Sequence, residues 1–161
     1  MSKEAPGLIR IYVDSDACPV KPEVVRVAQR YGLEVTFVSN AWMRLPEDWG
    51  AKLVVVEGTF DAADDWIAEH AAAGDVVVTA DIPLAHRCIK ARARVIGTHG
   101  QIFTDANIGN ILATRDLMHT LRGAGKITGG PAPFTQQDRS RFLQGLDRII
   151  QEIKKNDSAA R

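Results

Sequence analysis

The chain has 161 residues, of which 45% are hydrophobic and 25% are charged, and its formal net charge is zero. These values are typical of one folded globular domain and exclude disordered and fibrous proteins. No apolar run approaches the roughly 20 residues that a membrane-spanning helix needs, and no signal-peptide pattern is present, so we expect a cytoplasmic protein that does not enter a membrane. The two cysteines are too few for a disulfide framework.

Apolar segments alternate with helical patterns along the first part of the chain. The pattern predicts strands at 8–13, 33–38, 52–56, 75–80 and 93–97, and helices at Lys21–Tyr31, Asp61–Ala73 and Pro83–Ala91. Residues 40–50 are expected to form a loop with a short helical turn. Strands that are separated by helices of this length favour a parallel sheet covered on both faces. The predicted fold class is therefore α/β, a three-layer α/β/α sandwich with a mainly parallel sheet.

Beyond Gly100 the alternation stops and helices take over. Residues 104–122 have helical spacing that is interrupted near Gly109, and a glycine-rich connection that contains Gly129, Gly130 and Pro131 follows. Thr135 is expected to cap the last helix together with Asp138. We expect these C-terminal helices to pack on the sheet, which makes 1–155 a single domain and 156–161 a disordered tail.

Aspartates gather where predicted strands end. Asp14 and Asp16 follow the first strand, Asp61 and Asp64 open the helix after the third, and Asp81 follows the fourth. The carboxyl ends of parallel strands meet at one edge of a sheet, which is where open α/β sheets bind ligands. Carboxylates that converge there repel one another unless a divalent cation lies between them. The pattern therefore predicts a metal site.

Helix capping is the alternative explanation for these aspartates. Asp61 fits the N-cap of its helix, Asp64 the third helical position, and Asp81 the N-cap of the next helix. Capping explains one aspartate at each helix start, whereas two within three residues leave one unexplained. Asp14, Asp16 and Asp81 are therefore the strongest candidates.

Charge is unevenly distributed although the total is zero. Charged positions between 44 and 81 are mostly acidic, and those after 87 are mostly basic. A folded molecule with an acidic pocket beside a basic rim suits a polyanion, although helical surfaces of mixed charge give the same pattern. Cys18 stands before Pro19 at a helix start, where a lowered thiol pKa is expected.

Several segments together resemble the bacterial YaiI/YqxD family, also called UPF0178: VDSDACP, FDAAD, GDVVVTADIPLA, RDLMHTLR and TGGPAPFTQQDRSRF. The resemblance implies a PIN-like domain, a fold associated with metal-dependent ribonucleases. It implies that one or two Mg²⁺ or Mn²⁺ ions are held by Asp14, Asp16, Asp61, Asp64 and Asp81, with Asp14, Asp16 and Asp81 as the catalytic residues. Such ions activate a water for attack on a phosphodiester. Because PIN-like domains are generally ribonucleases, the resemblance implies RNA as the substrate in preference to DNA.

A further set of residues is expected to bind this substrate: Asn40, Arg44, Thr79, Arg87, Lys90, Arg115 and Arg122. The last four are candidates to hold the phosphate backbone, Thr79 to contact a metal-bound water or a phosphate oxygen, and Asn40 and Arg44 to border the pocket. One feature departs from many PIN-like nucleases, which have another acid shortly after the position of Asp81. Here residues 82–86 are Ile-Pro-Leu-Ala-His.

Two other functions remain open. An Asp-x-Asp after the first strand is also typical of haloacid-dehalogenase-type phosphatases, which would make Asp14 a nucleophile, Asp16 the acid/base and Lys90 the phosphate-binding cation. The paired acids that such enzymes carry after a fourth strand are missing. The third possibility is a non-catalytic PIN-like module that binds RNA or protein. We expect a monomer or a homodimer.

Overall fold

The computed structural model describes residues 8–59, 61–125 and 133–160, with side chains described as far as Asp157. The glycine-rich turn at Gly129–Pro131 lies outside these ranges. None of the described helices is both long enough and apolar enough to cross a membrane.

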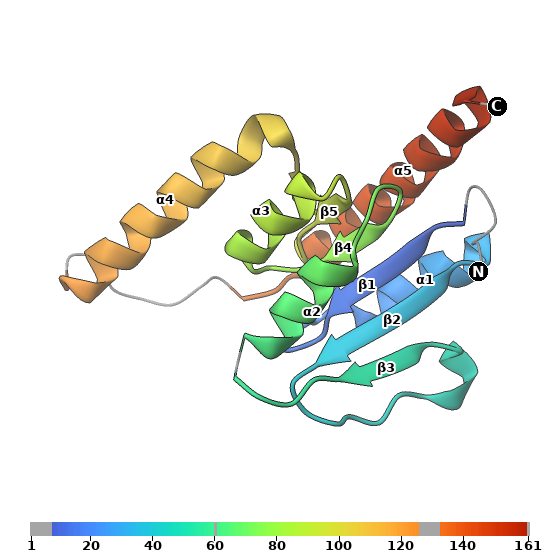
Figure 1. Ribbon diagram of the computed structural model, residues 1–161, viewed down its shortest axis with the longest axis horizontal. Helices are drawn as coiled ribbons and strands as arrows, with labels where there is room; N and C mark the ends of the chain where they lie inside the picture. The colour runs from blue at the N-terminus through green and yellow to red at the C-terminus, as the bar shows by residue number, and fades with distance from the viewer. Residues whose placement is uncertain (1–7, 60, 126–132, 161) are drawn as a thin grey trace.

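One six-stranded sheet forms the centre of the molecule (Figure 1). Its strands are β1 (Arg10–Asp14), β2 (Glu34–Ser39), β3 (Lys52–Val55), β4 (Val76–Val78), β5 (Arg94–Ile96) and β6 (Ile102–Phe103), in the order β3-β2-β1-β4-β5-β6. The first five strands are parallel and β6 is antiparallel. The chain moves outward from β1 first to one side and then, starting at β4, to the other. The gap between β1 and β4 is therefore the topological switch point, where open α/β sheets form a crevice.

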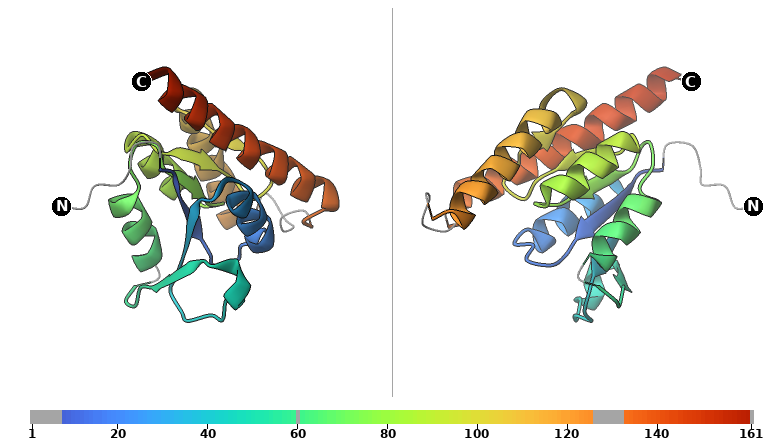
Figure 2. Two further views of the ribbon diagram at one scale, coloured as in Figure 1. Left: turned by 90° about the vertical axis from the view of Figure 1, so that its right-hand side faces the viewer. Right: turned by 60° about the vertical axis from the view of Figure 1, so that its left-hand side comes forward.

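Helices cover both faces of this sheet, which confirms the predicted three-layer α/β/α architecture (Figure 2). The helices α1 (Lys21–Tyr31) and α5 (Gln136–Ala160) pack on one face, and α2 (Ala62–His70) and α3 (Ile82–Lys90) pack on the other. Because successive strand residues point to opposite faces, Ile11 and Val13 join the first core and Tyr12 joins the second. All three are buried.

Apart from shifts of one or two residues at the ends of other elements, the structure differs from the sequence prediction in three elements. β6 was not predicted, because two residues are too short to show a strand pattern. α2 ends at His70, not at Ala73, because the Asp75 carboxylate accepts a hydrogen bond from the Ala72 amide at 3.0 Å and holds a turn there. The helix α4 (Asp105–Gly123) runs through Gly109 without interruption. The first part of α4 packs on α3, and the rest of α4 extends away from the sheet (Figure 1).

The predicted cap of the last helix is confirmed. The Thr135 hydroxyl accepts a hydrogen bond from the Asp138 amide at 3.0 Å, and the Asp138 carboxylate accepts one from the Thr135 amide at 3.0 Å. α5 continues to Ala160. The predicted division of the chain at residue 155 stays a prediction.

Candidate active site

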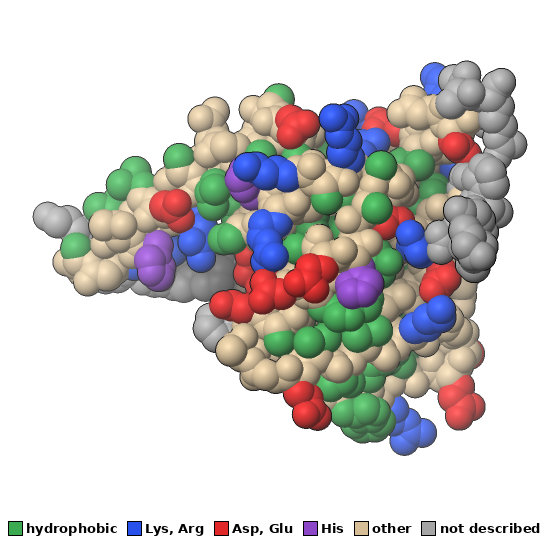
Figure 3. Space-filling view, in the orientation of Figure 1, with side chains coloured by type: hydrophobic (Ala, Val, Ile, Leu, Met, Phe, Trp, Pro, Cys, Tyr) green, Lys and Arg blue, Asp and Glu red, His purple; other side chains and the backbone are tan. Residues whose placement is uncertain are grey.

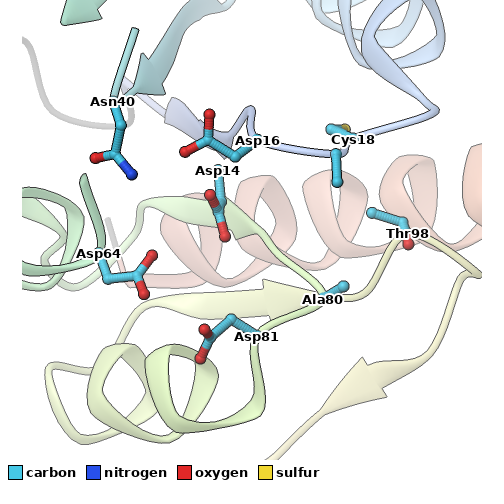
Figure 4. A pocket seen from close by; sticks show the side chains of 9 residues that line it. Asp14, Asp16, Cys18, Asn40, Asp64, Ala80, Asp81 and Thr98 are labelled. Atoms are coloured by element: carbon cyan, nitrogen blue, oxygen red, sulfur yellow. The ribbon is translucent and has the colours of Figure 1, made fainter. Parts of the chain in front are cut away.

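A pocket of about 370 Å³ opens at the switch point, beyond the carboxyl ends of β1 and β4. Figure 4 shows the carboxylates of Asp14, Asp64 and Asp81 facing a common space, with Asp16 beside them. The described residues that line the pocket include no lysine or arginine: they are Asp14, Asp16, Ala17, Cys18, Asn40, Asp64, Ala80, Asp81 and Thr98. Residues far apart in the sequence thus bring four carboxylates together, with no basic side chain among the described residues of the pocket wall.

A tight turn after β1 places the first two aspartates. Asp14 is the last residue of the strand, and the Ser15 amide continues the pairing by donating to the Val38 carbonyl at 3.0 Å. Ala17 has φ 59°, a left-handed conformation that costs a non-glycine residue about 1 kcal/mol or more. The Ser39 hydroxyl contacts Asp16 Oδ1 at 3.1 Å, which ties the turn to the end of β2.

Thr79 connects two of the acidic residues from beneath the pocket. Its hydroxyl donates to Asp14 Oδ2 at 2.8 Å and accepts a hydrogen bond from the Asp81 amide at 2.9 Å. Its exposed fraction is 0%, so the predicted contact between Thr79 and a substrate is wrong for this arrangement. Thr79 is a positioning residue that fixes the Asp14 carboxylate relative to the start of α3.

Asp81 is the N-cap of α3, as predicted. Its Oδ1 accepts a hydrogen bond from the Leu84 amide at 2.9 Å. A carboxylate has two oxygens and several acceptor positions, so capping with one oxygen leaves the other available to the pocket. Capping and metal binding are therefore compatible at this residue.

The two aspartates of α2 separate in space. Asp64 lies in the first turn of α2 and lines the pocket, whereas Asp61 is exposed and lines an adjoining groove. Asp61 is the N-cap residue of α2, as predicted, but its side chain makes no capping hydrogen bond. Asn40 takes part instead: its Oδ1 accepts a hydrogen bond from the Ala63 amide at 3.2 Å. The helix that presents Asp64 is thus tied to the end of β2.

Burial and mutual repulsion raise the pKa values of two of these acids. The pKa of Asp14 is raised to about 6, chiefly by burial and further by the charges of Asp16 and Asp81, against the lowering effect of its hydrogen bond from Thr79. The pKa of Asp64 is raised to about 7, again first by burial and then by the charges of Asp14 and Asp81. Both acids are therefore partly protonated near neutral pH, and a cation in the pocket would favour their ionised forms.

Cys18 also lines this pocket, and burial raises the pKa of its thiol. The lowered pKa expected from its position at a helix start is wrong. Desolvation outweighs the nearby Lys21 charge, and the Asp14 carboxylate adds to the rise.

The raised pKa of Asp14 predicts a stability effect. A carboxyl whose pKa is higher in the folded than in the unfolded state loses stabilisation as pH rises from about 4 to about 6. Without metal, Asp14→Asn should therefore stabilise the protein at pH 8 by about 1–3 kcal/mol, because asparagine keeps the acceptor for Thr79 and removes the charge. Urea unfolding in EDTA at pH 5 and pH 8 measures this difference.

Asp138→Asn is the control of opposite sign, because hydrogen bonds from Thr135 lower the pKa of the Asp138 carboxyl. A carboxyl whose pKa is lower in the folded state stabilises the fold above its ordinary pKa, so this replacement should lower the stability at both pH 5 and pH 8. An equal loss of stability in both variants would contradict the prediction that the Asp14 carboxylate destabilises the folded protein at pH 8.

The basic residues predicted to hold a substrate divide into three places. Arg87 and Arg115 line the adjoining groove, which shares Asp64 and Asp81 with the pocket. Arg87 pairs with Asp65 at 2.8 Å, and Arg115 pairs with Asp116 at 3.1 Å. Figure 3 shows acidic and basic side chains side by side near the middle of this face. The predicted acidic pocket with a basic rim is present here.

The other predicted basic contacts lie farther away. Lys90 lines a separate pocket with Arg92 and Arg94, at the edge of the sheet where β5 begins, so its predicted contact with a phosphate at Asp14 is wrong for this arrangement. Arg122 lies in the last turn of α4, on the part of that helix that extends away from the sheet. Arg44 lies exposed on the loop after β2.

The donor set suits a hard cation, but the side chains do not form a finished coordination shell. Carboxylate oxygens are the preferred protein ligands of Mg²⁺ and Mn²⁺. Within the described residues, however, no three acidic, histidine or cysteine side chains are arranged so that they could hold a metal ion as they stand. Mg²⁺ usually keeps several waters and needs only one or two direct carboxylates, and uncompensated carboxylates repel one another. The chemistry of the pocket therefore fits a largely hydrated divalent ion.

Fold and pocket define a doubly wound α/β domain with an acidic crevice at its switch point. Residues 12–152 match the model of a family described as uncharacterized, YaiI/YqxD, and the chain belongs to this family. A UPF0178 protein of Brucella ovis is 55% identical over 151 residues, which cover 93% of this chain and 94% of that protein. A UPF0178 protein of Paramagnetospirillum magneticum is 53% identical over 92% of this chain and 98% of that protein. No solved structure gives a significant match.

Proposed function

We propose that this protein is a divalent-metal-dependent nuclease that hydrolyses phosphodiester bonds, with RNA as its preferred substrate and a PIN-like mode of action. One observation carries the proposal: four carboxylates from three separate parts of the chain meet in a pocket that no lysine or arginine among the described residues lines. Two of them have pKa values raised towards neutrality. Perturbed acids in a crevice are typical of functional sites. We also propose a cytoplasmic location for this activity.

Each side chain has a defined task in this proposal. Asp14, Asp16, Asp64 and Asp81 hold one or two Mg²⁺ or Mn²⁺ ions, and Thr79 orients Asp14 and Asp81. A bound divalent ion supplies an activated water and neutralises charge on the phosphate oxygens. Arg87 and Arg115 lie where the groove leaves the pocket, and they exchange their present carboxylate partners for phosphate groups of the substrate. No side chain forms a covalent bond to the substrate.

A cleavage assay tests this function. Wild-type protein is incubated with a 5′-labelled single-stranded RNA in Mn²⁺, in Mg²⁺ and in EDTA, and the products are separated on a gel. We expect fragments with either metal and intact RNA in EDTA. RNA that stays intact in all three conditions would contradict the proposal.

The same preparation distinguishes the two alternatives. A phosphatase would release phosphate from a monoester and form a trappable phosphoaspartate at Asp14, but the position of Lys90 leaves that reaction without its expected cation. A non-catalytic module would bind RNA without metal and would bind it equally well after Asp14→Asn or Asp81→Asn.

A further inference from the structure

Trp42 is 73% exposed, more than any other large hydrophobic side chain among the described residues. It lies on the loop between β2 and β3, two residues after Asn40, which lines the acidic pocket. Two residues of chain span at most about 7 Å. A large, unburied aromatic ring is therefore held close to the mouth of the candidate active site.

Hydrogen bonds connect the residue before Trp42 to the acidic pocket. The Ala41 amide donates to the Ser39 hydroxyl at 3.2 Å, and the same hydroxyl contacts Asp16 Oδ1 at 3.1 Å. Asn40 is tied to α2 through the Ala63 amide. The start of the loop is thus part of the pocket wall.

The far end of the loop is anchored as well, so the exposure of Trp42 does not come from a detached loop. The ring of Trp49 packs on Phe37 with the ring centroids 5.7 Å apart. Leu45 packs against the core that α1 covers, and the Asp48 carbonyl accepts a hydrogen bond from Gln29 at 3.1 Å. Between these anchors the loop presents Trp42 and Arg44 to solvent.

Arg44 adds a cation beside the exposed ring. It is exposed, and within the described part of the chain it makes no hydrogen bond or ion pair. By contrast, Arg87, Arg94 and Arg115 each pair with an acid. A hollow of about 390 Å³ lies along this loop, and its lining includes Trp42, Arg44, Leu45 and Leu53.

We infer that Trp42 and Arg44 form a binding site for a flanking nucleotide of single-stranded nucleic acid, an inference that rests on the proposed function. The nucleobase stacks on the Trp42 ring, and Arg44 contacts the adjoining phosphate. Exposed aromatic rings next to free cations are the means by which proteins bind unpaired bases without reading their sequence. A base in a duplex is already stacked and paired, so this site selects single strands.

A binding assay that needs no cleavage tests the inference. Fluorescein-labelled single-stranded oligouridylate of ten nucleotides is titrated in EDTA with wild type, Trp42→Ala, Trp42→Phe and Arg44→Gln, and anisotropy gives Kd. The matched control is Leu117→Ala, because Leu117 is 57% exposed but lies on α4, away from the loop. Thermal melts check that Trp42→Ala stays folded, which its exposure leads us to expect.

Loss of one base–aromatic stack should weaken binding by Trp42→Ala about 5- to 100-fold. Trp42→Phe should stay within about 3-fold of wild type, and Leu117→Ala should match it. Arg44→Gln should weaken binding and reduce its salt dependence. Tryptophan fluorescence should be quenched by the oligonucleotide in wild type but not in Trp42→Phe, because Trp49 and Trp66 are partly buried.

Two results would overturn the inference: wild type that binds no single-stranded oligonucleotide, or Trp42→Ala that binds it as tightly as wild type. The second result would leave Trp42 as a contact for a protein partner. A failure of the proposed nuclease function alone would give a different result: the oligonucleotide would bind through Trp42, but RNA incubated with Mn²⁺ would stay intact.

Discussion

Replacing Asp14 by asparagine is expected to lower Mn²⁺-dependent RNA cleavage by about 10²- to 10³-fold. Asp14 lies at the centre of the acidic pocket, and its carboxylate is held by the Thr79 hydroxyl at 2.8 Å. Asparagine preserves the shape and the hydrogen bond but removes the charge that binds a cation. A contribution of several kcal/mol to transition-state stabilisation corresponds to this loss of rate. Single-turnover cleavage of the labelled RNA gives the rate constant.

Asp105→Asn is the matched control for this experiment. It makes the same chemical change at an exposed aspartate that lines the pocket where β5 begins, at the far end of α3 from Asp81. Its cleavage rate should equal that of wild type. A loss of less than about threefold in Asp14→Asn would show that the acidic pocket is not the site of reaction.

The second large effect is a pH dependence of metal binding. Because the pKa values of Asp14 and Asp64 are raised to about 6 and about 7, both acids hold a proton at pH 5.5, and a metal ion must displace it. Each displaced proton makes the affinity rise by up to about tenfold per pH unit. The affinity for Mn²⁺ should therefore increase about 100-fold between pH 5.5 and pH 8 and level off above the higher pKa.

Calorimetry at several pH values, in buffers of different ionisation enthalpy, measures both the affinity and the number of protons released. Release should approach two protons per binding event at pH 5.5 and fall towards zero at pH 8. An affinity that does not change over this range would mean that Asp14 and Asp64 are not ligands.

The sequence predicted the elements with regular patterns and missed those that depend on tertiary contacts. The alternation of apolar strands with helices was sufficient to predict a parallel sheet. Because parallel strands end at the same edge, it was also sufficient to predict that Asp14 and Asp81 lie close together. β6 has only two residues, which are too few to show the alternating pattern of a strand. The early end of α2 depends on the Asp75 carboxylate, whose hydrogen bond with Ala72 no local pattern reveals.

Side-chain roles within the site were harder to predict than the site itself. The sequence offers Asp61 and Asp64 alike as metal ligands, and the position of α2 against β1 and β2 decides that Asp64 faces the pocket. Thr79 looked like a substrate contact because it ends a strand, but the neighbouring strands bury it completely. Lys90 follows Asp81 closely in sequence, yet a helix of nine residues carries it about 13 Å away.

The sequence shows Trp42 only as part of the loop at residues 40–50 and predicts no function for it. The structure shows that Trp49 and Leu45 are the loop residues that pack against the core, and that Trp42 is left exposed. Arg44 was predicted to contact a substrate. It is exposed and pairs with no carboxylate among the described residues, and its substrate contact stays a prediction.

The most direct test of the central claim is a calorimetric titration of Mn²⁺ into wild type, Asp14→Asn and Asp105→Asn at pH 8. The metal-site hypothesis predicts saturable binding to wild type and Asp105→Asn, and binding at least about tenfold weaker to Asp14→Asn. If wild type takes up no Mn²⁺ at millimolar concentration, or if Asp14→Asn binds it equally well, the acidic pocket is not a metal centre.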